Sequence, residues 1–523
     1  MRNKTGTTKS NRAMRESEDE RKNSELEDLI ESRRFFPDKA AAEAAKIADR
    51  LTPETVEREL AKGRRDLRGL EIVTIDGEDT RDVDDGVSLV RIGGGWELGV
   101  HIADVAHYVK PGSAVDREAY RRGTSVYFPD AVLPMLPAEL SNGICSLNVG
   151  EDRLALTVMM RTDTDGNIVS HEIFESVINV KYKITYDEYY RLFEGDAETR
   201  GKLAAIFADH ATSLAEMRRL AELRRRIRVS RGMLDFELPE TKVSIGKNGR
   251  PDGVYPYRIT FANGVIEEFM IAANETVAAH FSLPGMPFIY RNHPGPDKEK
   301  LAELDGAVRL FGFRLTDRKG GLIEGAIADM LEKSAGTGAG PLIQKLTLAS
   351  MGKAVYSAVC DGHFALASGK YTHFTSPIRR YPDLYIHRVI KESLYGARPE
   401  TLASRYPDSA TVAAGCSEAE REAEKAERFY TDKMVAAYMA GFQGEDFVGT
   451  VSGMTSFGLF ITLGNSAEGL LFYSDMPDRM IFDPRRLIAK GQRTGRKYRL
   501  GDTVEVRLAA ADEKTGRIQF LFA

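Results

Sequence analysis

The amino-acid sequence predicts an α+β protein whose chain ends in a small β-barrel. Two strand–turn–strand patterns come early, at residues 87–109 and 153–180, and helical apolar periods dominate the middle of the chain. About five short strands, separated by glycine and polar turns, fill the last 80 or so residues and are typical of an oligonucleotide-binding barrel. We therefore predict a polar amino-terminal segment over residues 1–34, a large mixed domain over 35–441 and a barrel over 442–523.

The composition is that of a soluble protein with several domains. The chain has 523 residues, of which 42% are apolar and 29% are charged. Its first residues lack the apolar run of a signal peptide, and no stretch approaches the ~18 apolar residues of a membrane span. The three cysteines lie far apart and form no metal-type pair. These features predict a cytoplasmic protein without a membrane segment.

The net charge of −5 argues against indiscriminate nucleic-acid binding, since backbone affinity comes from lysine and arginine. A locally basic groove remains possible, because residues 485–507 hold eight basic side chains against only Asp502 and Glu505. On charge alone this stretch is either a solvated basic loop or a surface for a phosphate backbone.

The individual elements follow from local patterns. Residues 1–34 are polar and charge-rich, which predicts disorder or a loose helix. Two helices follow, the second of which begins at Pro53 with Thr52 as its N-cap. "GLEIVTID" is an apolar strand that ends at Asp76, and Asp165–Gly166 is the turn of the second hairpin.

Three later helices carry polar positions of interest. In the helix at 265–281, Glu267 and Asn274 lie seven residues apart and so share a face. "PDLYIHRVIKESLYG" predicts a second helix. A long third helix begins with Ser417 and Glu420, which have the spacing of a capping box.

Residues 74–87, "TIDGEDTRDVDDGV", crowd six carboxylates into ten positions beside a single basic residue, Arg81. Such crowding requires a counter-charge. A calcium loop of the EF-hand type is excluded because strands flank the segment and the spacing does not fit. A phosphatase-type nucleophile is excluded because Asp82 follows "GEDTR" and does not close an apolar strand.

A divalent-metal site for phosphodiester chemistry remains. Asp76 closes the apolar strand, and Asp82, Asp84 and Asp85 follow six, eight and nine residues later. Their hard oxygen ligands suit Mg²⁺ or Mn²⁺, which can neutralise a phosphate and activate water. The competing interpretation is an exposed acidic loop without a ligand.

"HFTSPIRRYPD" offers complementary charge. Arg379 and Arg380 lie between two prolines, so a stiff backbone presents their guanidinium groups, which bind phosphate bidentately. For Arg379 we expect a phosphate shared with the acidic loop. For Arg380, an RNA contact and an ion pair with carboxylates are equally good interpretations.

Other side chains admit two interpretations. Tyr127 and Phe128 precede a proline-rich loop and either stack on bases or belong to the core. His101, Asp104 and His107 suggest a metal site, but on one continuous strand the two histidines lie roughly 20 Å apart. We therefore expect these three residues to be structural hydrogen-bonding groups.

The chain resembles the ribonuclease II and ribonuclease R family of exoribonucleases over about residues 35–523. The motifs described above occur here in the same order as in that family. The matching segments include "TIDGEDTRDVDDGVSL", "VIEEFMIAANETVAAHF" and "YTHFTSPIRRYPDLYIHR", and the tail is similar to the S1-type RNA-binding barrel of that family. Ribonuclease R is the more similar of the two. The resemblance implies processive 3′–5′ hydrolysis of single-stranded RNA, from its 3′ end, to nucleoside 5′-monophosphates. It also implies Mg²⁺, a monomer, and no small-molecule cofactor.

The resemblance also implies roles for residues. The catalytic and metal-binding carboxylates are Asp76, Asp82, Asp84 and Asp85, with Asp76 and Asp85 as direct ligands and Asp84 as the residue whose loss stops the chemistry. Arg379 matches the arginine that grips the phosphate at the scissile bond. The matching RNA-binding positions are Tyr127 and Phe236 as an aromatic clamp, Glu267, Tyr186, and Phe457 and Phe460 in the barrel. Glu427 matches a position where family members carry a modulating glutamate.

Two departures from the family pattern lead to further expectations. The cold-shock barrels that normally precede the catalytic domain and the lysine-rich tail of ribonuclease R are not seen in this sequence. We expect weaker and less selective RNA binding with the catalytic channel intact. The alternatives are a non-catalytic RNA-binding protein that keeps the fold, which the four retained aspartates argue against, and a metal-dependent DNA nuclease.

Overall fold

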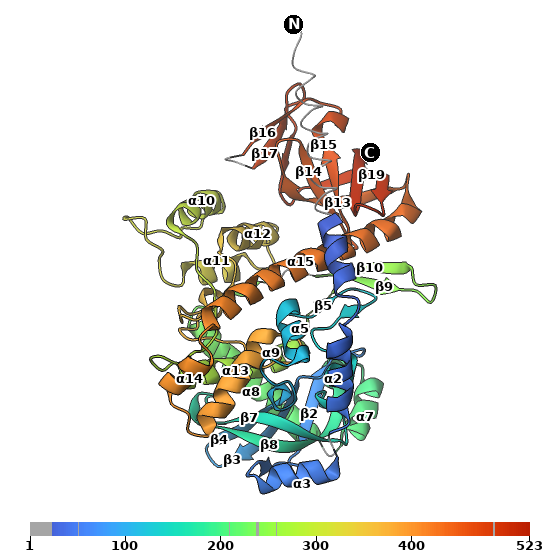
Figure 1. Ribbon diagram of the computed structural model, residues 1–523. Helices are drawn as coiled ribbons and strands as arrows, with labels where there is room; N and C mark the ends of the chain where they lie inside the picture. The colour runs from blue at the N-terminus through green and yellow to red at the C-terminus, as the bar shows by residue number, and fades with distance from the viewer. Residues whose placement is uncertain (1–23, 51, 209, 237–239, 258, 485–486) are drawn as a thin grey trace.

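The computed structural model describes residues 24–50, 52–208, 210–236, 240–257, 259–484 and 487–523. A six-stranded sheet with helices around it forms the lower body in Figure 1, and a closed barrel lies at the other end of the molecule. The predicted α+β class and the terminal barrel are both confirmed.

The sheet has the strand order β1-β8-β2-β3-β4-β7. Its long strand β8 pairs with β7 through its first part and runs parallel to β2 through its last part, so it joins both sides of the sheet. Both predicted hairpins are present, and Gly166 takes a left-handed φ of 88° in the turn of the second. The strands are β1 (Arg65–Asp66), β2 (Ile72–Asp76), β3 (Asp85–Ile92), β4 (Gly95–Ala103), β7 (Asp152–Thr162) and β8 (Ile168–Thr185).

Helices cover this sheet. The second helix, α3 (Pro53–Ala61), begins as predicted with the Thr52 side chain accepting a hydrogen bond from the Thr55 amide. The central helix α9 (Phe261–Phe281) buries most of its residues against the main core, because it is apolar around nearly all of its circumference. The others around the sheet are α2 (Asp38–Ala48), α4 (Val105–Tyr108), α5 (Ala114–Arg122), α6 (Tyr186–Glu194), α7 (Ala197–Ile206), α8 (Ala211–Ser230), α13 (Tyr381–Leu394) and α14 (Pro399–Arg405).

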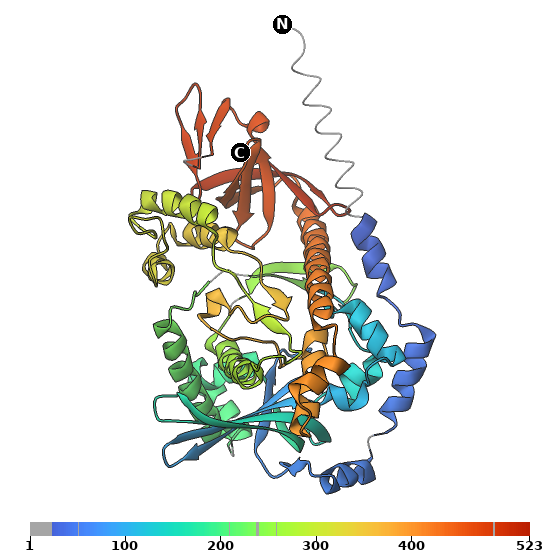
Figure 2. The same cartoon turned by 60° about the vertical axis from the view of Figure 1, so that its left-hand side comes forward.

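The long helix α15 (Ser409–Met439) connects the sheet body to the barrel (Figures 1 and 2). The predicted capping box at Ser417 and Glu420 is wrong, since the helix begins eight residues earlier and both positions lie within it. The Ser417 hydroxyl donates to the Ala413 carbonyl and accepts from the Tyr356 amide, whereas Glu420 pairs with Arg291. Both residues serve tertiary contacts, which sequence spacing alone does not reveal.

A small helical module with its own apolar core lies beside the barrel. It consists of α10 (Lys298–Val308), α11 (Ala326–Ser334) and α12 (Gly340–Ser350). The Lys345 ammonium donates to the Ser452 carbonyl of the barrel at 2.6 Å. The large domain predicted as one unit therefore contains a second, separate core.

The barrel closes in the order β13-β14-β15-β20-β19. Val435, Ala436 and Met439 at the end of α15 pack into its core, so this helix is part of both domains. Its strands are β13 (Asp446–Met454), β14 (Gly458–Leu463), β15 (Glu468–Phe472), β19 (Thr503–Asp512) and β20 (Arg517–Phe522).

The basic stretch is not a loop over most of its described length. It contributes to a three-stranded sheet of β16 (Met480–Asp483), β17 (Ile488–Gly491) and β18 (Lys497–Arg499). Lys490 and Lys497 are exposed and lie opposite each other across β17 and β18. Arg485 and Arg486, which also belong to the predicted basic surface, lie outside the described residues.

The amino-terminal segment is helical where it is described, over residues 24–32. Leu26, Leu29 and Ile30 pack against a small core that includes Ala423 and Ala426 of α15, and Glu27 pairs with Lys433 at 2.9 Å. Residues 1–23 of the predicted polar segment lie outside the described residues. Among the helices described, none is both long and apolar enough to cross a membrane.

The two histidines and Asp104 are structural, as expected, although the strand breaks before His107. His101 is fully buried between the hydroxyls of Ser88 and Thr157, each at 2.9 Å. Asp104 caps α4 and pairs with Arg64 and Lys391. These ion pairs leave no carboxylate oxygen of Asp104 available for a metal.

Candidate active site

The acidic loop joins two neighbouring strands and is held from both sides. Asp76 is the last residue of β2, and Asp85 is the first residue of β3. On one side, the Val83 amide donates to Ser146 Oγ at 3.1 Å, and the Leu147 amide donates to the Val83 carbonyl at 3.0 Å. On the other side, the Ile378 amide donates to Asp84 Oδ1 at 2.8 Å.

This placement buries carboxylates close to one another. Burial raises the pKa of Asp76 to about 6 and the pKa of Asp85 to about 7, and repulsion from neighbouring aspartates contributes to both. Burial also raises the pKa of Asp84 well above its usual range, against the opposing effect of Arg379. The predicted aspartates therefore form one cluster whose ionised form is electrostatically unfavourable without a cation.

Arg379 supplies part of the counter-charge. Its Nε lies 3.5 Å from Asp84 Oδ2, and its Nη2 donates to Ser376 Oγ at 3.0 Å. The side chain is 43% exposed, so the guanidinium group can bind a further anion. The structure thus brings "TSPIRR" to the acidic loop, as the sequence predicts.

Two tyrosines complete the cluster. The Tyr127 hydroxyl donates to Asp82 Oδ2 at 2.8 Å, and its backbone amide donates to Glu427 Oε1 of α15 at 2.7 Å. Tyr127 lies in the short hairpin of β5 (Val126–Tyr127) and β6 (Val132–Leu133) and is 38% exposed, so its ring is available for stacking. Phe128 instead stacks on Tyr430 at 4.4 Å.

Tyr186 follows Thr185, which pairs in register with Asp76, and this places it at the same site. Burial raises its pKa, and the charges of Asp85 and Asp76 raise it further. Tyr186 is therefore a neutral phenol beside the carboxylates.

The residues present fit a hard divalent cation in their chemistry. Within the described residues, Oδ2 of Asp76 and Oδ2 of Asp84 are buried and accept no hydrogen bond, and only the Arg379 guanidinium, 3.5 Å away, faces the Asp84 oxygen. Buried oxygens of this kind are costly unless something else satisfies them, and a cation would do so. Across the described residues, however, no three His, Cys, Asp or Glu side chains already stand in a metal-binding arrangement.

Arg380 differs from its neighbour. It lies at the start of α13, is largely buried and donates to Asp383 Oδ1 at 2.7 Å. The structure therefore places it in an internal ion pair, in agreement with the second of the two interpretations of this residue.

Two predicted RNA contacts, Glu267 and Phe236, contact residues outside the acidic loop. Glu267 is half exposed on α9 and pairs with Arg228 at 3.3 Å. Phe236 packs against the core of the helical module, and no ring contact between it and Tyr127 is found among the described residues.

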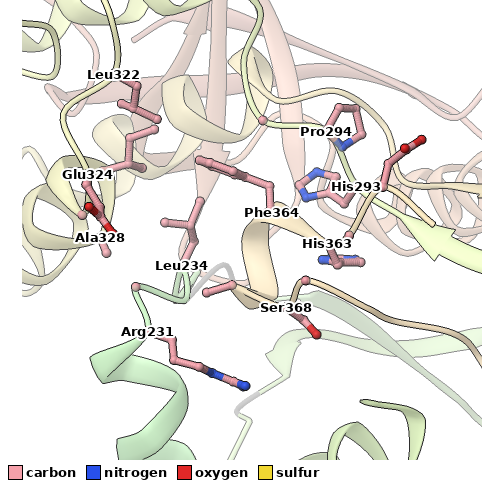
Figure 3. Close-up of a pocket in the computed structure, with 18 of the residues that line it drawn as sticks. Arg231, Leu234, His293, Pro294, Leu322, Glu324, Ala328, His363, Phe364 and Ser368 are labelled. Carbon is pink, nitrogen blue, oxygen red and sulfur yellow. The ribbon is translucent and has the colours of Figure 1, made fainter. Parts of the chain in front are cut away.

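A cavity of about 530 Å³ opens next to that module (Figure 3). It lies between the end of α8, the loop at 361–369 and α11. Arg231, Leu234 and Phe364 extend into it in Figure 3, and His293 and His363 form one wall. Because Leu234 is two residues from Phe236, this cavity adjoins the predicted aromatic contact.

On the barrel, Phe457 is exposed and Phe460 is half-buried, both on or next to β14. The Phe457 ring lies 6.3 Å from the ring of Phe472 on β15. Phe472 is a third aromatic that sequence reasoning missed, and the alternation of "GLLF" is the one signal that could have indicated it.

Sequence reasoning also missed Lys183. It lies on β8 opposite Thr74, donates to the Thr80 carbonyl at 2.6 Å and lowers the pKa of Asp76 against the effect of burial. Only the parallel pairing of β8 with β2 brings it there, and no local pattern reveals that pairing.

Two family matches cover most of the chain. The RNB domain matches residues 64–396, and the S1 RNA binding domain matches residues 442–522. Ribonuclease R of Thermotoga maritima is 41% identical over 492 residues, covering 93% of this chain and 68% of that protein. The chain spans 57% of the length of ribonuclease R 1 from Lactococcus lactis, with 38% identity.

Comparison with solved structures agrees with these sequence matches. The apo form of Mycoplasma genitalium RNase R superposes with a TM-score of 0.80 and 29% identity, covering 93% of this chain and 78% of that one. Yeast Ssd1, described as a pseudonuclease, shares the fold with a TM-score of 0.63 and 22% identity, covering 84% of this chain and 53% of that one. The matched domains, their order and the identity to ribonuclease R show that the chain belongs to the ribonuclease R family of exoribonucleases.

Proposed function

We propose that this protein is a Mg²⁺-dependent exoribonuclease that hydrolyses single-stranded RNA processively from its 3′ end to nucleoside 5′-monophosphates. The observation that carries the proposal is the convergence of four aspartates from one loop with Arg379 from a distant loop. Mn²⁺ has the same ligand preference and is expected to substitute.

Each group of residues at this site has a separate role in the proposed reaction. Asp76, Asp82, Asp84 and Asp85 would hold the metal, which would supply charge neutralisation at the phosphate and an activated water. Arg379 binds the phosphate next to the scissile bond through its exposed guanidinium group. The Tyr127 ring stacks on the terminal base, and the hydrogen bond that the Tyr127 amide donates to Glu427 fixes the backbone that carries this ring.

The barrel and the cavity of Figure 3 support a path for the RNA strand. The exposed ring of Phe457 and the half-buried ring of Phe460 suit base stacking, and the exposed lysines of the neighbouring sheet suit the phosphate backbone. One solved relative, the Mycoplasma genitalium enzyme, is described in complex with ribose methylated single-stranded RNA. Single-stranded RNA is accordingly the substrate that we propose.

The alternative is an RNA-binding protein that keeps the fold without the chemistry. The likeness to Ssd1 shows that the fold alone does not decide between the two. The retained aspartates and the unsatisfied oxygens of Asp76 and Asp84 favour an enzyme, because a protein that only binds RNA gains nothing from burying these groups.

The test uses one oligonucleotide sequence made as all-ribose and as all-deoxyribose strands, each labelled at the 5′ end or at the 3′ end. We expect the 5′-labelled RNA to shorten progressively with Mg²⁺ and the 3′-labelled RNA to release labelled mononucleotide at once. EDTA should stop both reactions, and the DNA strands should persist. Internal fragments from the first time points, or equal loss of DNA, would contradict the proposal.

A further inference from the structure

A second cavity, of about 260 Å³, lies against the acidic loop. It is lined by Thr80, Arg81 and Val83 of the loop, by Asn142 and residues 147–149, and by Lys183 of β8. Asp82 and Asp84, which contact Tyr127 and Ile378, do not line it. The residues of the loop that line this cavity are therefore different from those that contact Tyr127 and Ile378.

The polar groups that line this cavity are hydrogen-bond donors. Asn142 and Asn148 use their side-chain oxygens to accept from Ser141 and Ser146, which leaves both amide NH₂ groups to donate. Lys183 gives one hydrogen bond to the Thr80 carbonyl and keeps two further N–H groups. No aspartate or glutamate is among the lining residues, although six carboxylates stand in the adjoining loop.

Neither Arg81 nor Lys183 forms an ion pair with a carboxylate in the part of the chain that the structure describes, although the charge of Lys183 lowers the pKa of Asp76. Arg81 makes no side-chain hydrogen bond or ion pair there, even with Glu78 and Asp79 two and three residues away. A guanidinium group that stays free beside available carboxylates on its own loop is poised for an anion from solution.

We propose that this cavity binds a phosphate monoester dianion, namely the 5′-phosphate of the nucleotide released at the neighbouring carboxylates. The proposal rests on the proposed function, because that reaction produces such a group. A dianion that leaves the carboxylates is repelled by them and attracted by Arg81 and Lys183. The volume is several times the ~30 Å³ that one water occupies and accommodates a phosphate with part of its ribose.

The test measures the binding of inorganic phosphate, AMP and adenosine to the full chain by calorimetry in EDTA, where no RNA is cleaved. Arg81→Ala is compared with Arg398→Ala, which removes another exposed arginine, at the start of α14, that forms no ion pair with any residue the structure describes. We expect phosphate and AMP to bind the unmodified protein and Arg398→Ala alike. Binding to Arg81→Ala, and to Lys183→Gln as a second variant, should be at least about ten-fold weaker.

Equal affinity of Arg81→Ala and the unmodified protein for both phosphates would overturn the proposal. Binding of inorganic phosphate without AMP would also overturn it, because the product would then be excluded. If adenosine bound as tightly as AMP, the phosphate would contribute nothing to the affinity and the base would account for binding. That result would also overturn the proposal. Since no cleavage is measured, this result is independent of whether the protein degrades RNA.

Discussion

At the scale of residues, the acidic loop holds carboxylates in an environment that disfavours their ionised forms. Asp85 illustrates this, because burial raises its pKa to about 7 and the charge of Asp76 adds repulsion. A pKa raised by folding means that the folded protein loses stability as the pH rises from about 4 to about 7, while the group ionises. Such a site sacrifices stability for the ability to bind a cation.

Asp85→Asn removes this charge and should stabilise the metal-free protein. In EDTA at pH 8 we expect a gain of about 1–3 kcal/mol in the free energy of unfolding, which shrinks as the pH falls toward 5. Urea unfolding at the two pH values measures the difference. Added Mg²⁺ should stabilise the unmodified protein at pH 8 and leave the variant nearly unchanged. A variant that is less stable than the unmodified protein at pH 8 in EDTA would refute this account of the loop.

Tyr127 contributes a ring and a hydroxyl, which two substitutions separate. Tyr127→Phe loses the hydrogen bond to Asp82 and keeps the ring, so RNA affinity should change by less than about three-fold. Tyr127→Ala loses the stacking surface, worth ~1–3 kcal/mol, and should bind RNA at least about five-fold more weakly. Filter binding in EDTA provides the measurement. Equal losses in both variants would show that the hydroxyl matters and the ring does not.

At the scale of elements, α15 joins parts that are far apart in sequence. It contributes Glu427 to the Tyr127 amide and Ala423 and Ala426 to the core under that hairpin, and its last turn enters the barrel. Its contact with the end of α5 is especially close: a Cβ on Gly123 would lie 2.5 Å from the Cβ of Ala419. The position of α15 therefore bears directly on the geometry of the active site.

A matched pair of glycines tests that contact. Gly112 and Gly123 both have a left-handed φ, of 74° and 67°, but a Cβ on Gly112 would meet nothing within 4 Å. Gly112→Ala should cost about 1–2 kcal/mol for its backbone conformation alone. Gly123→Ala should cost a further ~1–3 kcal/mol for overpacking against α15. Thermal unfolding measures the loss of stability in both variants. Equal losses would mean that α15 can move away from residue 123 without a cost in free energy.

Features that depend on residues close in sequence could be predicted, whereas features that depend on tertiary contacts could not. Asp76, Asp82, Asp84 and Asp85 could be identified because they are close in sequence, and Thr52 and Pro53 mark a helix start by local chemistry alone. Lys183, Phe472 and the true start of α15 were not predicted, because each depends on tertiary contacts. Arg380 shows the same limit, since its neighbour Arg379 has the same local sequence and only burial against Asp383 separates the two.

At the scale of the whole molecule, the catalytic body and the barrel are linked by shared packing. Val435, Ala436 and Met439 of α15 lie in the barrel core, and Lys345 reaches from the helical module to β13. The barrel carries the exposed ring of Phe457 and the half-buried ring of Phe460, and a basic sheet adjoins it. This arrangement predicts that long RNA contacts both parts, whereas a short oligonucleotide contacts only the catalytic body.

The lysines of the basic sheet allow a test. Lys490 and Lys497 lie directly opposite each other, an arrangement of like charges that destabilises a sheet. The double variant Lys490→Gln with Lys497→Gln should lower the slope of log affinity against log salt by about 1–2 for long RNA, without loss of thermal stability. Filter binding across a salt series, with a hexamer as the control, measures this slope. An unchanged slope would remove the sheet from the RNA-binding surface.

The most direct test of the central claim compares two aspartates of the same loop. Asp84 is buried between Arg379 and the Ile378 amide, whereas the Asp79 side chain is exposed and forms no hydrogen bond or ion pair among the described residues. A time course with 5′-labelled RNA and Mg²⁺ follows the unmodified protein, Asp84→Asn and Asp79→Asn, with RNA binding measured in parallel. We predict that Asp84→Asn binds RNA and shortens it at least about 10³-fold more slowly, while Asp79→Asn remains within about two-fold of the unmodified protein. Degradation by Asp84→Asn at the unmodified rate would contradict the assignment of the active site.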